Sequence, residues 1–503
     1  MSLIARIVFC LTACCGQVSA LSVAKIFGDA MVLQRERPIP IWGRGTPSAE
    51  VTVEFKGKKH STRVDNEGRW RLEMPPLAAS NRGLELAVRS EENTLVLRDV
   101  LIGEVWFAGG QSNMAHSMRS SAGKLPEFAS LIAEADYRRI RIRKVNESNA
   151  ATPRPDLSGG SWVLATPDSA RHFSAVAYLF ARRLHKELDV PVGIIEAAWG
   201  GTPIEPQIPT AAFTGHPTLE RIRKLGAKKD LAALHAMPGG TFARSEVWLA
   251  GQIFNGRIAP VAPYAIRGAI WYQGESNCGN AEDPRDYAVK MRALIKGWRA
   301  AWQRPDLPFY FVQLPQWKSP AWPYLREEQR QAMDVPGSGM AVTIDLNFHN
   351  DIHPPNKLDV AERLARWPLA QVHGKKVAFR SAMYREHKME GDVITVGFAH
   401  AEGGLVAGKT NTGEFIATPE TPINGFEICS KDGVWRAAKA VVAGSSVKVS
   451  APEGSAPIAV RYACQPVASA EQPWNLYNRA GLPAAPFSSD WARMPYKTEA
   501  NGH

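Results

Sequence analysis

The sequence lacks several patterns that would assign it at once to a large structural class. No internal repeat occurs at the periods of solenoid or propeller proteins, and no low-complexity tract interrupts the chain. Beyond the first twenty residues, no apolar run approaches the length of a membrane-spanning helix. What remains is an ordinary globular composition, 45% apolar and 22% charged, in a chain of 503 residues that is long enough for two to four domains.

Basic residues are in excess, with a net charge of +11, but they form no long stripe with interleaved aromatic residues. Nucleic-acid-binding proteins usually gather their Lys and Arg side chains in such a stripe. We therefore expect no nucleic-acid partner. Fifteen tryptophans are present. Most of them are expected in the core, and their number alone does not indicate sugar binding.

Residues 1–20 have the pattern of a signal peptide. Arg6 supplies the positive charge, residues 7–13 the apolar region and residues 18–20 a small-residue cleavage site. This pattern predicts a secreted or periplasmic protein with no membrane span. The letters LTAC, which end at Cys14, also resemble a lipoprotein cleavage box, so a lipid anchor at Cys14 is the alternative.

Short runs with partial apolar alternation, such as EVTVEF and RWRLEM, fill residues 21–100 and are separated by turn-rich pieces. They predict a small N-terminal β-sandwich. Residues 371–495 contain similar runs, such as VITVGF and IAVRYAC, and predict a C-terminal β-domain.

The segment between them, residues 101–370, has near-continuous apolar runs that suit strands buried on both faces of a parallel sheet. Helical spacing of apolar residues occurs between these runs, at 174–188, 286–302 and 358–370. The alternation predicts a doubly wound α/β domain, in which helices cover both faces of a parallel sheet.

Cysteine is scarce, and only Cys278, Cys429 and Cys464 follow the leader. Export permits disulfides. Cys429 and Cys464 lie in one predicted β-domain, where the sequence is compatible with a disulfide or with two free thiols. Cys278 would be left over.

Polar clusters follow four of the apolar runs of the α/β segment. They are GQSN at 110–113, WGGT at 199–202, QGESN at 273–277 and DLNFHNDIHP at 345–354. In open α/β sheets, ligands bind beyond the carboxyl ends of the strands. We therefore expect all four clusters to face one crevice.

Ser112 is the candidate nucleophile of this crevice. A serine hydroxyl needs a base that takes its proton, and the base needs an orienting partner. His353 is the candidate base and Asp351 the candidate orienter. A tetrahedral intermediate also needs donors to its oxyanion. The N–H of Ser112, an N–H of Gly200 or Gly201 and a side-chain amide of QGESN are the candidates.

The other polar residues of the clusters are expected to support the site. We interpret Glu275 as a hydrogen-bond anchor rather than an acid, and His116 as a solvated residue on a helix face. The supporting residues are Gln111, Asn113, Glu275 and Asn277.

Several alternative chemistries lack their motifs. His349, Asp351 and His353 alternate, but no further cluster completes a set of metal ligands, so no metal is expected. No phosphate-binding glycine loop lies between a strand and a helix. The absence of G-x-S-x-G argues against an α/β-hydrolase.

Taken together, GEVWFAGGQSNM, VPVGIIEAAWGGTPIE, IWYQGESN and NDIHPPNK resemble the sialate O-acetylesterase family of the SGNH hydrolases. Residues 27–45 resemble that family's N-terminal β-domain, and residues 475–490 resemble its C-terminal end. The resemblance implies a flavodoxin-like, three-layer SGNH domain flanked by β-domains. It also implies hydrolysis of O-acetyl groups on sugars without metal or cofactor, with an acetyl-enzyme intermediate.

The resemblance places the family's serine on Ser112, its histidine on His353 and its oxyanion glycine on Gly200 or Gly201. For the third oxyanion donor it favours Gln273, with Asn277 second.

The sequence departs from the SGNH pattern at two points. Three residues before the histidine, that pattern has Asp, but Asn350 stands here and Asp351 follows it. A Ser–His dyad assisted by a backbone carbonyl therefore remains an alternative. The segment PIEPQIP also lacks the tryptophan that the family often has after PIE.

Three other functions stay open at this point. An esterase for acetylated xylan or another polysaccharide would use the same chemistry. A catalytically inactive carbohydrate-binding protein would keep the β-domains but release no acetate. A thioester or lipid hydrolase would need a wide apolar groove, and the sequence has no lid-like amphipathic stretch.

Overall fold

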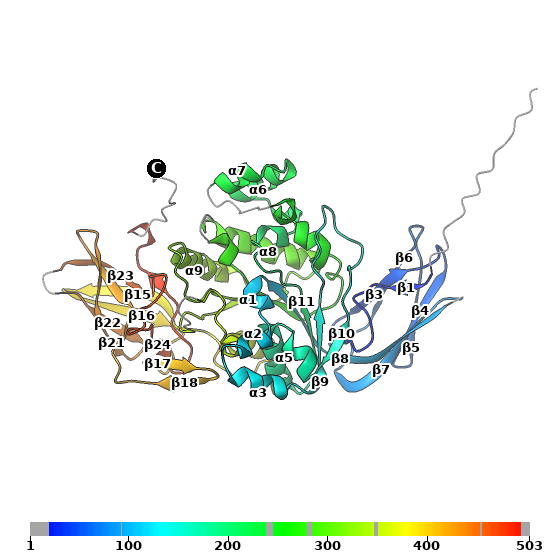
Figure 1. Cartoon of the computed structure of the whole chain (residues 1–503), viewed down its shortest axis with the longest axis horizontal. Helices are drawn as coiled ribbons and strands as arrows, with labels where there is room; N and C mark the ends of the chain where they lie inside the picture. Colours follow the sequence, from blue (N-terminus) through cyan, green and yellow to red (C-terminus); the bar gives the residue numbers. More distant parts are fainter. Residues whose placement is uncertain are drawn as a thin grey trace, which may run out of the picture.

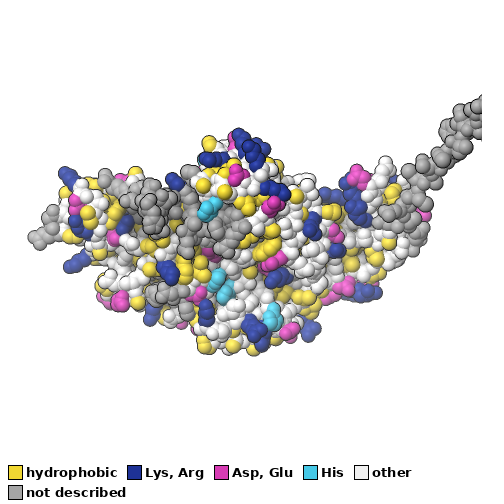
Figure 2. Space-filling view, turned by 45° about the horizontal axis from the view of Figure 1, so that its top comes forward, with side chains coloured by type: hydrophobic (Ala, Val, Ile, Leu, Met, Phe, Trp, Pro, Cys, Tyr) yellow, Lys and Arg dark blue, Asp and Glu magenta, His cyan; other side chains and the backbone are white. Residues whose placement is uncertain are grey.

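The computed structural model of the chain describes residues 20–91, 93–237, 245–278, 284–346, 351–452 and 455–493. Three parts follow one another along the long axis of the molecule (Figure 1): N-terminal strands at one end, an α/β unit in the middle and C-terminal strands at the other end. On the face shown in Figure 2, Lys and Arg side chains are spread over all three parts and are interspersed with acidic side chains.

The N-terminal part consists of two sheets whose strands alternate buried and exposed residues. In β6 (Arg69–Met74), Trp70, Leu72 and Met74 are buried, while the residues between them are exposed. One sheet has the strand order β1-β3-β6, and the other joins β2, β4, β5 and β7 to β8. The bounds are β1 (Ser22–Val23), β2 (Val32–Gln34), β3 (Ile39–Arg44), β4 (Glu50–Phe55), β5 (Lys58–Arg63), β7 (Ser80–Arg89) and β8 (Thr94–Gly110).

Strand β8 is 17 residues long and belongs to both the N-terminal sandwich and the central sheet. Its first half pairs with β7, and its second half pairs in parallel with β11 and β12. The boundary expected between residues 100 and 101 thus lies inside a single strand. The sequence shows no turn-rich piece at this point because the strand continues through it.

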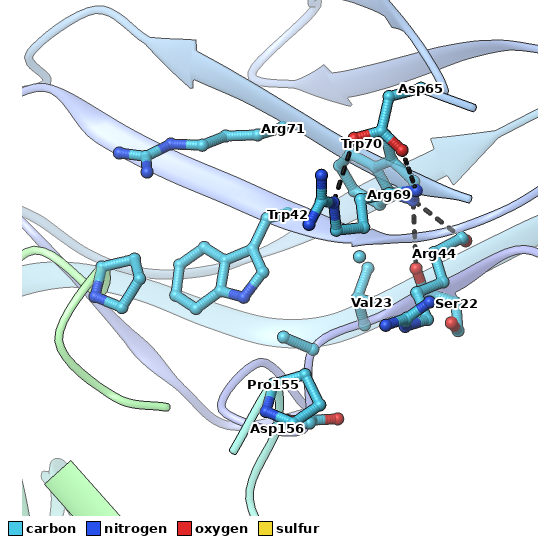
Figure 3. Close-up of a pocket in the computed structure, with 13 residues that line it drawn as sticks. Ser22, Val23, Trp42, Arg44, Asp65, Arg69, Trp70, Arg71, Pro155 and Asp156 are labelled. Carbon is cyan, nitrogen blue, oxygen red and sulfur yellow. Dashed lines mark hydrogen bonds and ion pairs between the residues drawn. The ribbon is translucent and has the colours of Figure 1, made fainter. Parts of the chain in front are cut away.

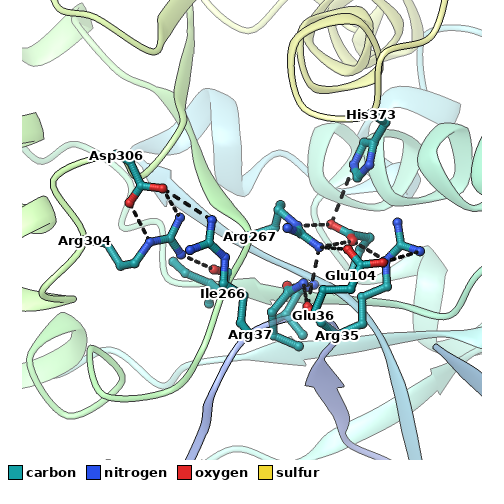
Figure 4. A network of polar contacts seen from close by, with 11 residues as sticks. Arg35, Glu36, Arg37, Glu104, Ile266, Arg267, Arg304, Asp306 and His373 are labelled. Atoms are coloured by element: carbon teal, nitrogen blue, oxygen red, sulfur yellow. Dashed lines mark hydrogen bonds and ion pairs between the residues drawn. The ribbon is translucent and has the colours of Figure 1, made fainter. Parts of the chain in front are cut away.

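A buried charge cluster fixes the same junction (Figure 4). The fully buried Glu104 of β8 accepts hydrogen bonds from Nε of Arg35 at 2.6 Å and from Nε and Nη2 of Arg267 at 2.9 Å each. Burial alone would raise the pKa of Glu104, but the hydrogen bonds and charges of its partners outweigh it and lower this pKa. The carboxylate therefore stays ionised and joins the two parts.

The central sheet has the strand order β10-β9-β11-β8-β12-β13-β14. All neighbours in this order are parallel except the edge pair, because β10 runs antiparallel to β9. The expected sheet is thus parallel except at this edge. The bounds are β9 (Tyr137–Lys144), β10 (Trp162–Ala165), β11 (Val192–Glu196), β12 (Gly268–Tyr272), β13 (Phe309–Val312) and β14 (Ser338–Ala341).

Helices cover both faces of this sheet, as the two neighbouring residues Trp106 and Phe107 of β8 show. Successive side chains of a strand point to opposite faces. Trp106 contacts Phe180 of α5, with ring centroids 5.2 Å apart, and Phe107 contacts Trp298 of α8 at the same distance. The three-layer α/β prediction is therefore confirmed.

The three helices expected from apolar periodicity are present as α5, α8 and α10, each within one residue of the predicted ends. Within the described ranges, no helix is long and apolar enough to cross a membrane. The helix bounds are α1 (Ser112–Ala115), α2 (Met118–Ala122), α3 (Glu127–Ala133), α4 (Pro167–Arg171), α5 (Ala175–Leu188), α6 (Pro217–Ala227), α7 (Leu231–Ala236), α8 (Tyr287–Ala301), α9 (Trp322–Gln331) and α10 (Lys357–Gln371).

The C-terminal part is built from three small antiparallel sheets of strands β15 to β25. In β22, Val447 and Val449 are buried between exposed or half-buried residues, which is the alternation that the sequence predicted. The bounds are β15 (Met383–Glu390), β16 (Val393–Ala399), β17 (Leu405–Asn411), β18 (Glu414–Ala417), β19 (Phe426–Ser430), β20 (Trp435–Ala437), β21 (Lys439–Ala443), β22 (Ser446–Ser450), β23 (Pro457–Tyr462), β24 (Leu476–Asn478) and β25 (Phe487–Ser488).

All three cysteines that follow the leader are buried, and no disulfide joins any of them within the described residues. The register of β19 and β23 pairs Cys429 with Ala459, so that Cys464 lies five residues further along the chain (459 to 464). The Sγ of Cys464 donates to the carbonyl of Phe487 at 3.0 Å, while that of Cys429 donates to the carbonyl of Ser430 at 3.4 Å. The disulfide alternative is therefore wrong, because the strand register separates the two thiols.

Candidate active site

The candidate nucleophile stands at the first position of α1, two residues after β8 ends. The chain turns sharply at Gly110, whose φ is 135°, a value that favours glycine. A Cβ atom at this position would lie 2.1 Å from the backbone oxygen of Tyr272 in the adjacent strand β12. The glycine therefore allows the tight turn that leaves Ser112 half-exposed at the carboxyl edge of the sheet.

His353 reaches this serine from a distant part of the chain. Its Nε2 atom lies 2.8 Å from Ser112 Oγ, which is hydrogen-bond distance. Burial lowers the pKa of the imidazole, and the nearby Lys357 cation lowers it further. The ring is therefore neutral at pH 7, as an acceptor of the serine proton must be. His349 and Asn350 lie outside the described residues.

Asp351 lies near His353 but does not bond to its ring. One carboxylate oxygen accepts the backbone N–H of His353 at 2.9 Å, and the other forms an ion pair with Lys124. Among the described residues, no carboxylate or carbonyl accepts a hydrogen bond from the imidazole. The expected carboxylate–imidazole hydrogen bond is therefore absent from this arrangement, because the Asp351 side chain turns back to cap its own loop.

His116 lies beside His353, with ring centroids 6.2 Å apart and planes inclined by 29°. Burial lowers the pKa of His116 to about 3, and its Nε2 atom has no hydrogen-bond partner in the part of the chain that the structure describes. His116 as a whole is half-exposed, but its Nε2 atom is buried, so the interpretation of His116 as a solvated residue is only partly correct. The available signal was its spacing, since His116 follows Ser112 by one helical turn.

The second cluster, WGGT, lies directly against the nucleophile. The N–H of Trp199 donates to the carbonyl of Gly110 at 3.1 Å. A Cβ atom on Gly200 would lie 3.6 Å from the Cβ of Ser112, so the Gly200 backbone borders the serine side chain. Gly201 has a φ of 73° and lies further out, near Trp248. Of the two glycines, Gly200 is thus the one beside the candidate nucleophile.

The third cluster, QGESN, supports the nucleophile indirectly. Nε2 of Gln273 donates to Oε1 of Gln111 at 3.0 Å and to Oδ1 of Asn277 at 2.8 Å. Gln273 is fully buried and both of its amide hydrogens are engaged, so its assignment as an oxyanion donor does not fit this geometry. Asn277 is also buried and directs its amide N–H groups to Glu205.

Gln111 is the side-chain amide nearest to the nucleophile. Its Nε2 lies 3.5 Å from Ser112 Oγ, and its Oε1 accepts hydrogen bonds from Gln273 and from the backbone N–H of Ser276. These two bonds fix the amide so that its N–H₂ end faces Ser112. Gln273 therefore acts by orienting Gln111.

Asn113 connects the clusters through a buried network. Its Nδ2 donates to Oε1 of Glu275 at 2.5 Å and to the carbonyl of Ile352 at 2.9 Å, while its Oδ1 accepts from Lys357 at 2.5 Å. The amide thus uses both donors, and the bond to Ile352 holds the residue that precedes His353. Glu275 meets Asn113 rather than Ser112, which is the geometry of an anchor.

Lys357 was not predicted from the sequence as a residue of the site. The residue is fully buried, and burial lowers its pKa to about 7, while burial raises the pKa of Glu275 to about 7. Both values reflect the cost of placing charge in an apolar interior. The usable signal was position, because Lys357 opens helix α10 four residues after His353.

The C-terminal part holds both flanks of the segment that carries His353. Upstream, Asp345 forms a bidentate ion pair with Arg363 at 2.6 and 2.7 Å and accepts hydrogen bonds from Thr410 of β17 and Tyr477 of β24, each at 2.8 Å. Downstream, the backbone N–H of Gly413 donates to Asp359 of α10 at 3.0 Å. Strands of the C-terminal part therefore position the base from outside the crevice.

The described residues contain no group of three or more His, Cys, Asp or Glu side chains that could hold a metal ion. The arrangement itself offers a serine hydroxyl with a neutral imidazole at hydrogen-bond distance and backbone N–H groups beside it. Nucleophilic attack on a carbonyl carbon requires these three elements.

Comparison with known proteins agrees with this chemistry. Residues 102–366 match the family described as carbohydrate esterase, sialic acid-specific acetylesterase. Sialate O-acetylesterases from Homo sapiens and Pongo abelii are each 30% identical over 392 residues, 70% of this chain and 71% of theirs. The crystal structure of a carbohydrate acetylesterase from Xanthomonas citri matches with a TM-score of 0.80 and 32% identity, over 93% of this chain and 99% of that chain.

Proposed function

Because the chain belongs to the family of sialic acid-specific carbohydrate acetylesterases, we propose that it hydrolyses O-acetyl esters of sialic acid with Ser112 as nucleophile. The observation that carries the assignment of residues is the distance of 2.8 Å between Ser112 Oγ and Nε2 of His353. Membership of the family makes the chain a carboxylic ester hydrolase that removes O-acetyl groups from carbohydrate. The proposal concerns the sugar and the role of each residue.

In the first step, Ser112 Oγ attacks the acetyl carbonyl carbon while Nε2 of His353 takes the hydroxyl proton. The carbonyl oxygen becomes an oxyanion. The backbone N–H groups of Ser112 and Gly200 and the Nε2 of Gln111 are the donors for it, since all three border the serine side chain.

The tetrahedral intermediate then collapses, and the ester bond to the sugar breaks. His353 gives its proton to the departing sugar oxygen, which leaves the acetyl group bound to Ser112. A water molecule attacks this acetyl-enzyme, again with His353 as the base. Acetate leaves, and the serine hydroxyl is restored.

The test of substrate class is acetate release from O-acetylated sialic acid and from acetylated xylan, measured side by side with the purified protein. We expect release from sialic acid to be the faster. Faster release from xylan would replace the sugar in the proposal but keep the chemistry. Release from neither substrate by folded protein would favour an inactive carbohydrate-binding protein.

The Asp351→Asn variant tests the role of Asp351. Loss of an aspartate that bonds the imidazole costs a triad hydrolase about 10⁴-fold in kcat, whereas here we expect about tenfold or less. The asparagine oxygen can still accept the backbone N–H of His353. The carboxylate charge raises the pKa of His353, so removing it should move the acid limb of kcat/KM to lower pH.

Lys124→Met is the matched control for this pH profile. The Lys124 cation lowers the pKa of His353, so its removal should move the acid limb to higher pH. The proposed arrangement would be contradicted if the acid limb of kcat/KM shifted equally in the two variants. A loss of kcat in Asp351→Asn as large as that caused by removing a triad aspartate would also contradict it.

We also propose that the protein is exported and that residues 1–20 are removed. The proposal rests on the sequence pattern, because residues 1–19 lie outside the described structure. N-terminal sequencing of the protein recovered after export should begin at Leu21. A lipid-modified N-terminus at Cys14 would support the alternative of an anchored protein.

A further inference from the structure

A hollow of about 320 Å³ lies where the N-terminal sheet β1-β3-β6 meets two loops of the α/β unit (Figure 3). Trp42 and Arg44 of β3 and Arg71 of β6 line it on one side, and Pro155 and Pro263 line it on the other. The hollow contains no residue of the catalytic crevice. Its volume is that of a small-molecule pocket.

The strand register places the aromatic ring among cations. In the antiparallel pair of β3 and β6, Trp42 is opposite Arg71, and Arg44 is opposite Arg69. Opposed residues share a face, and residues two apart on one strand share it too. One face of this ribbon therefore presents an indole and three guanidinium groups to the hollow, whose lining also includes the carboxylates of Asp65 and Asp156.

Among the described residues, two of these guanidinium groups have no carboxylate partner. Arg69 is held by Asp65 and Glu67. Arg44 donates only to the backbone carbonyl of Glu67 at 3.4 Å, and Arg71 has no hydrogen bond or ion pair with any residue of the described ranges. Arg71 thus offers a free planar fork of N–H donors, which is the geometry that binds a carboxylate at two points.

The indole of Trp42 is fixed and half-exposed. The edge of Phe27 packs against it, with ring centroids 4.7 Å apart and planes inclined by 74°. Because this contact holds the ring, a ligand that stacks on it does not have to order it first. Flat, partly exposed indoles suit the apolar C–H face of a sugar ring, whose hydroxyl groups stay in water.

A second hollow of about 330 Å³ adjoins the first and shares Arg71 and Pro263 with it. Arg37 and Arg304 also line it, and both form ion pairs with Asp306. Arg71 therefore stands at the junction of a groove that is longer than one sugar ring. Each hollow alone lies near the lower limit for small-molecule sites.

The chain offers an internal contrast. In the C-terminal part, the guanidinium carbon of Arg461 lies 4.4 Å from the ring centroid of Trp435, but its Nε and Nη2 donate to the Glu427 carboxylate at 2.7 and 2.9 Å. An indole beside an arginine is therefore not sufficient for a site. What distinguishes the groove is an arginine left without an acidic partner.

We propose that this groove is a non-catalytic site for an acidic oligosaccharide, with one sugar ring stacked on Trp42 and a carboxylate held by Arg71. The choice of ligand rests on the proposed function, because the substrate's own sugar carries a carboxylate. The site would hold the glycan chain while another residue of that chain enters the catalytic crevice. This second contact with the same glycan chain raises the effective concentration of that chain at the catalytic crevice.

Binding is best measured by calorimetry in the Ser112→Ala background, with a linear sialic acid tetramer without O-acetyl groups as the probe. Trp42→Ala and Arg71→Gln should each weaken affinity by about tenfold or more. Arg89→Gln is the matched control, since Arg89 is an exposed arginine of the other N-terminal sheet and lies 3.7 Å from Glu54. The Arg89→Gln variant should bind the tetramer as tightly as the Ser112→Ala protein does.

Two further results would overturn the proposal. One is equal affinity of Arg71→Gln and Arg89→Gln, and the other is a neutral xylan tetramer that binds as tightly as the sialic acid tetramer. If Trp42→Ala lowers the thermal midpoint of unfolding, the test rests on Arg71→Gln, which changes an exposed side chain. Absence of tetramer binding by the Ser112→Ala protein would also overturn it.

Catalysis is tested separately on monomeric O-acetylated sialic acid, with Ser112 present. The Trp42 and Arg71 variants should release acetate at the unaltered rate, because both residues lie outside the crevice. Absence of acetate release by the unmodified protein would contradict the proposed function and leave the binding result standing. The two failures are therefore distinguishable.

Discussion

Ser112→Ala should lower kcat for acetate release by about 10⁴- to 10⁶-fold, which is the range seen when a serine hydrolase loses its nucleophile. The same loss is expected for His353→Ala, because Nε2 of His353 is the group within 2.8 Å that can take the serine proton. Acetate release from O-acetylated sialic acid measures both. The two residues act as one unit, so the double variant should be no slower than either single variant.

Ser120→Ala provides the control for the serine. Ser120 lies on α2 near the site, but it is exposed and bonds to Ser117. Its removal should leave kcat unchanged. Additive losses in the Ser112 and His353 double variant would show that the two side chains do not share one proton transfer.

Arg363→Met should lower the free energy of unfolding by about 3–5 kcal/mol, the loss expected when one partner of a buried ion pair is removed. Arg363 and Asp345 are both almost fully buried, with side-chain exposures of 5% and 2%. Burial would raise the pKa of Asp345, but Arg363 outweighs it and keeps this pKa below its ordinary value. Without Arg363, the buried carboxylate loses its cation. Urea unfolding measures the change.

Two variants check this explanation. Arg292→Met breaks an exposed pair with Asp334, whose side chains are 36% and 60% exposed, and should change stability little. Adding Asp345→Asn to Arg363→Met should restore part of the loss, because a neutral amide can still accept from Thr410 and Tyr477. No recovery would show that packing of the arginine stem, rather than its charge, is what matters.

The sequence predicted the three longest helices, α5, α8 and α10, and many of the core strands because their signal is local. Apolar spacing in α5 and alternation in β6 are visible within a dozen residues. The antiparallel direction of β10 and the continuity of β8 were not predicted. Strand direction and strand sharing depend on which neighbours the strands meet, and no short window of residues contains this information.

The residues of the candidate site likewise divide into those that the sequence predicted and those that it did not. Ser112 and His353 follow from polar clusters at strand ends, because parallel strands bring those ends to one edge. The hydrogen-bond partners of Asp351 and Gln273 could not be predicted from the sequence, since each side chain has several donors or acceptors within reach. Only the packed structure selects Lys124 for Asp351 and Gln111 for Gln273. Lys357 was missed because a buried lysine is rare outside such networks.

Because strand β8 pairs in both the N-terminal sandwich and the central sheet, we expect these two parts to unfold together. Excision at residue 100 would cut the strand, separate β2 from the β8 residues that it pairs with and leave Glu104 buried without Arg35. Because Ser112 stands two residues beyond the end of this strand, the excised catalytic part would lose support at its nucleophile. Exchange of N-terminal modules between relatives would therefore have to transfer the whole of β8, together with the catalytic turn that it carries.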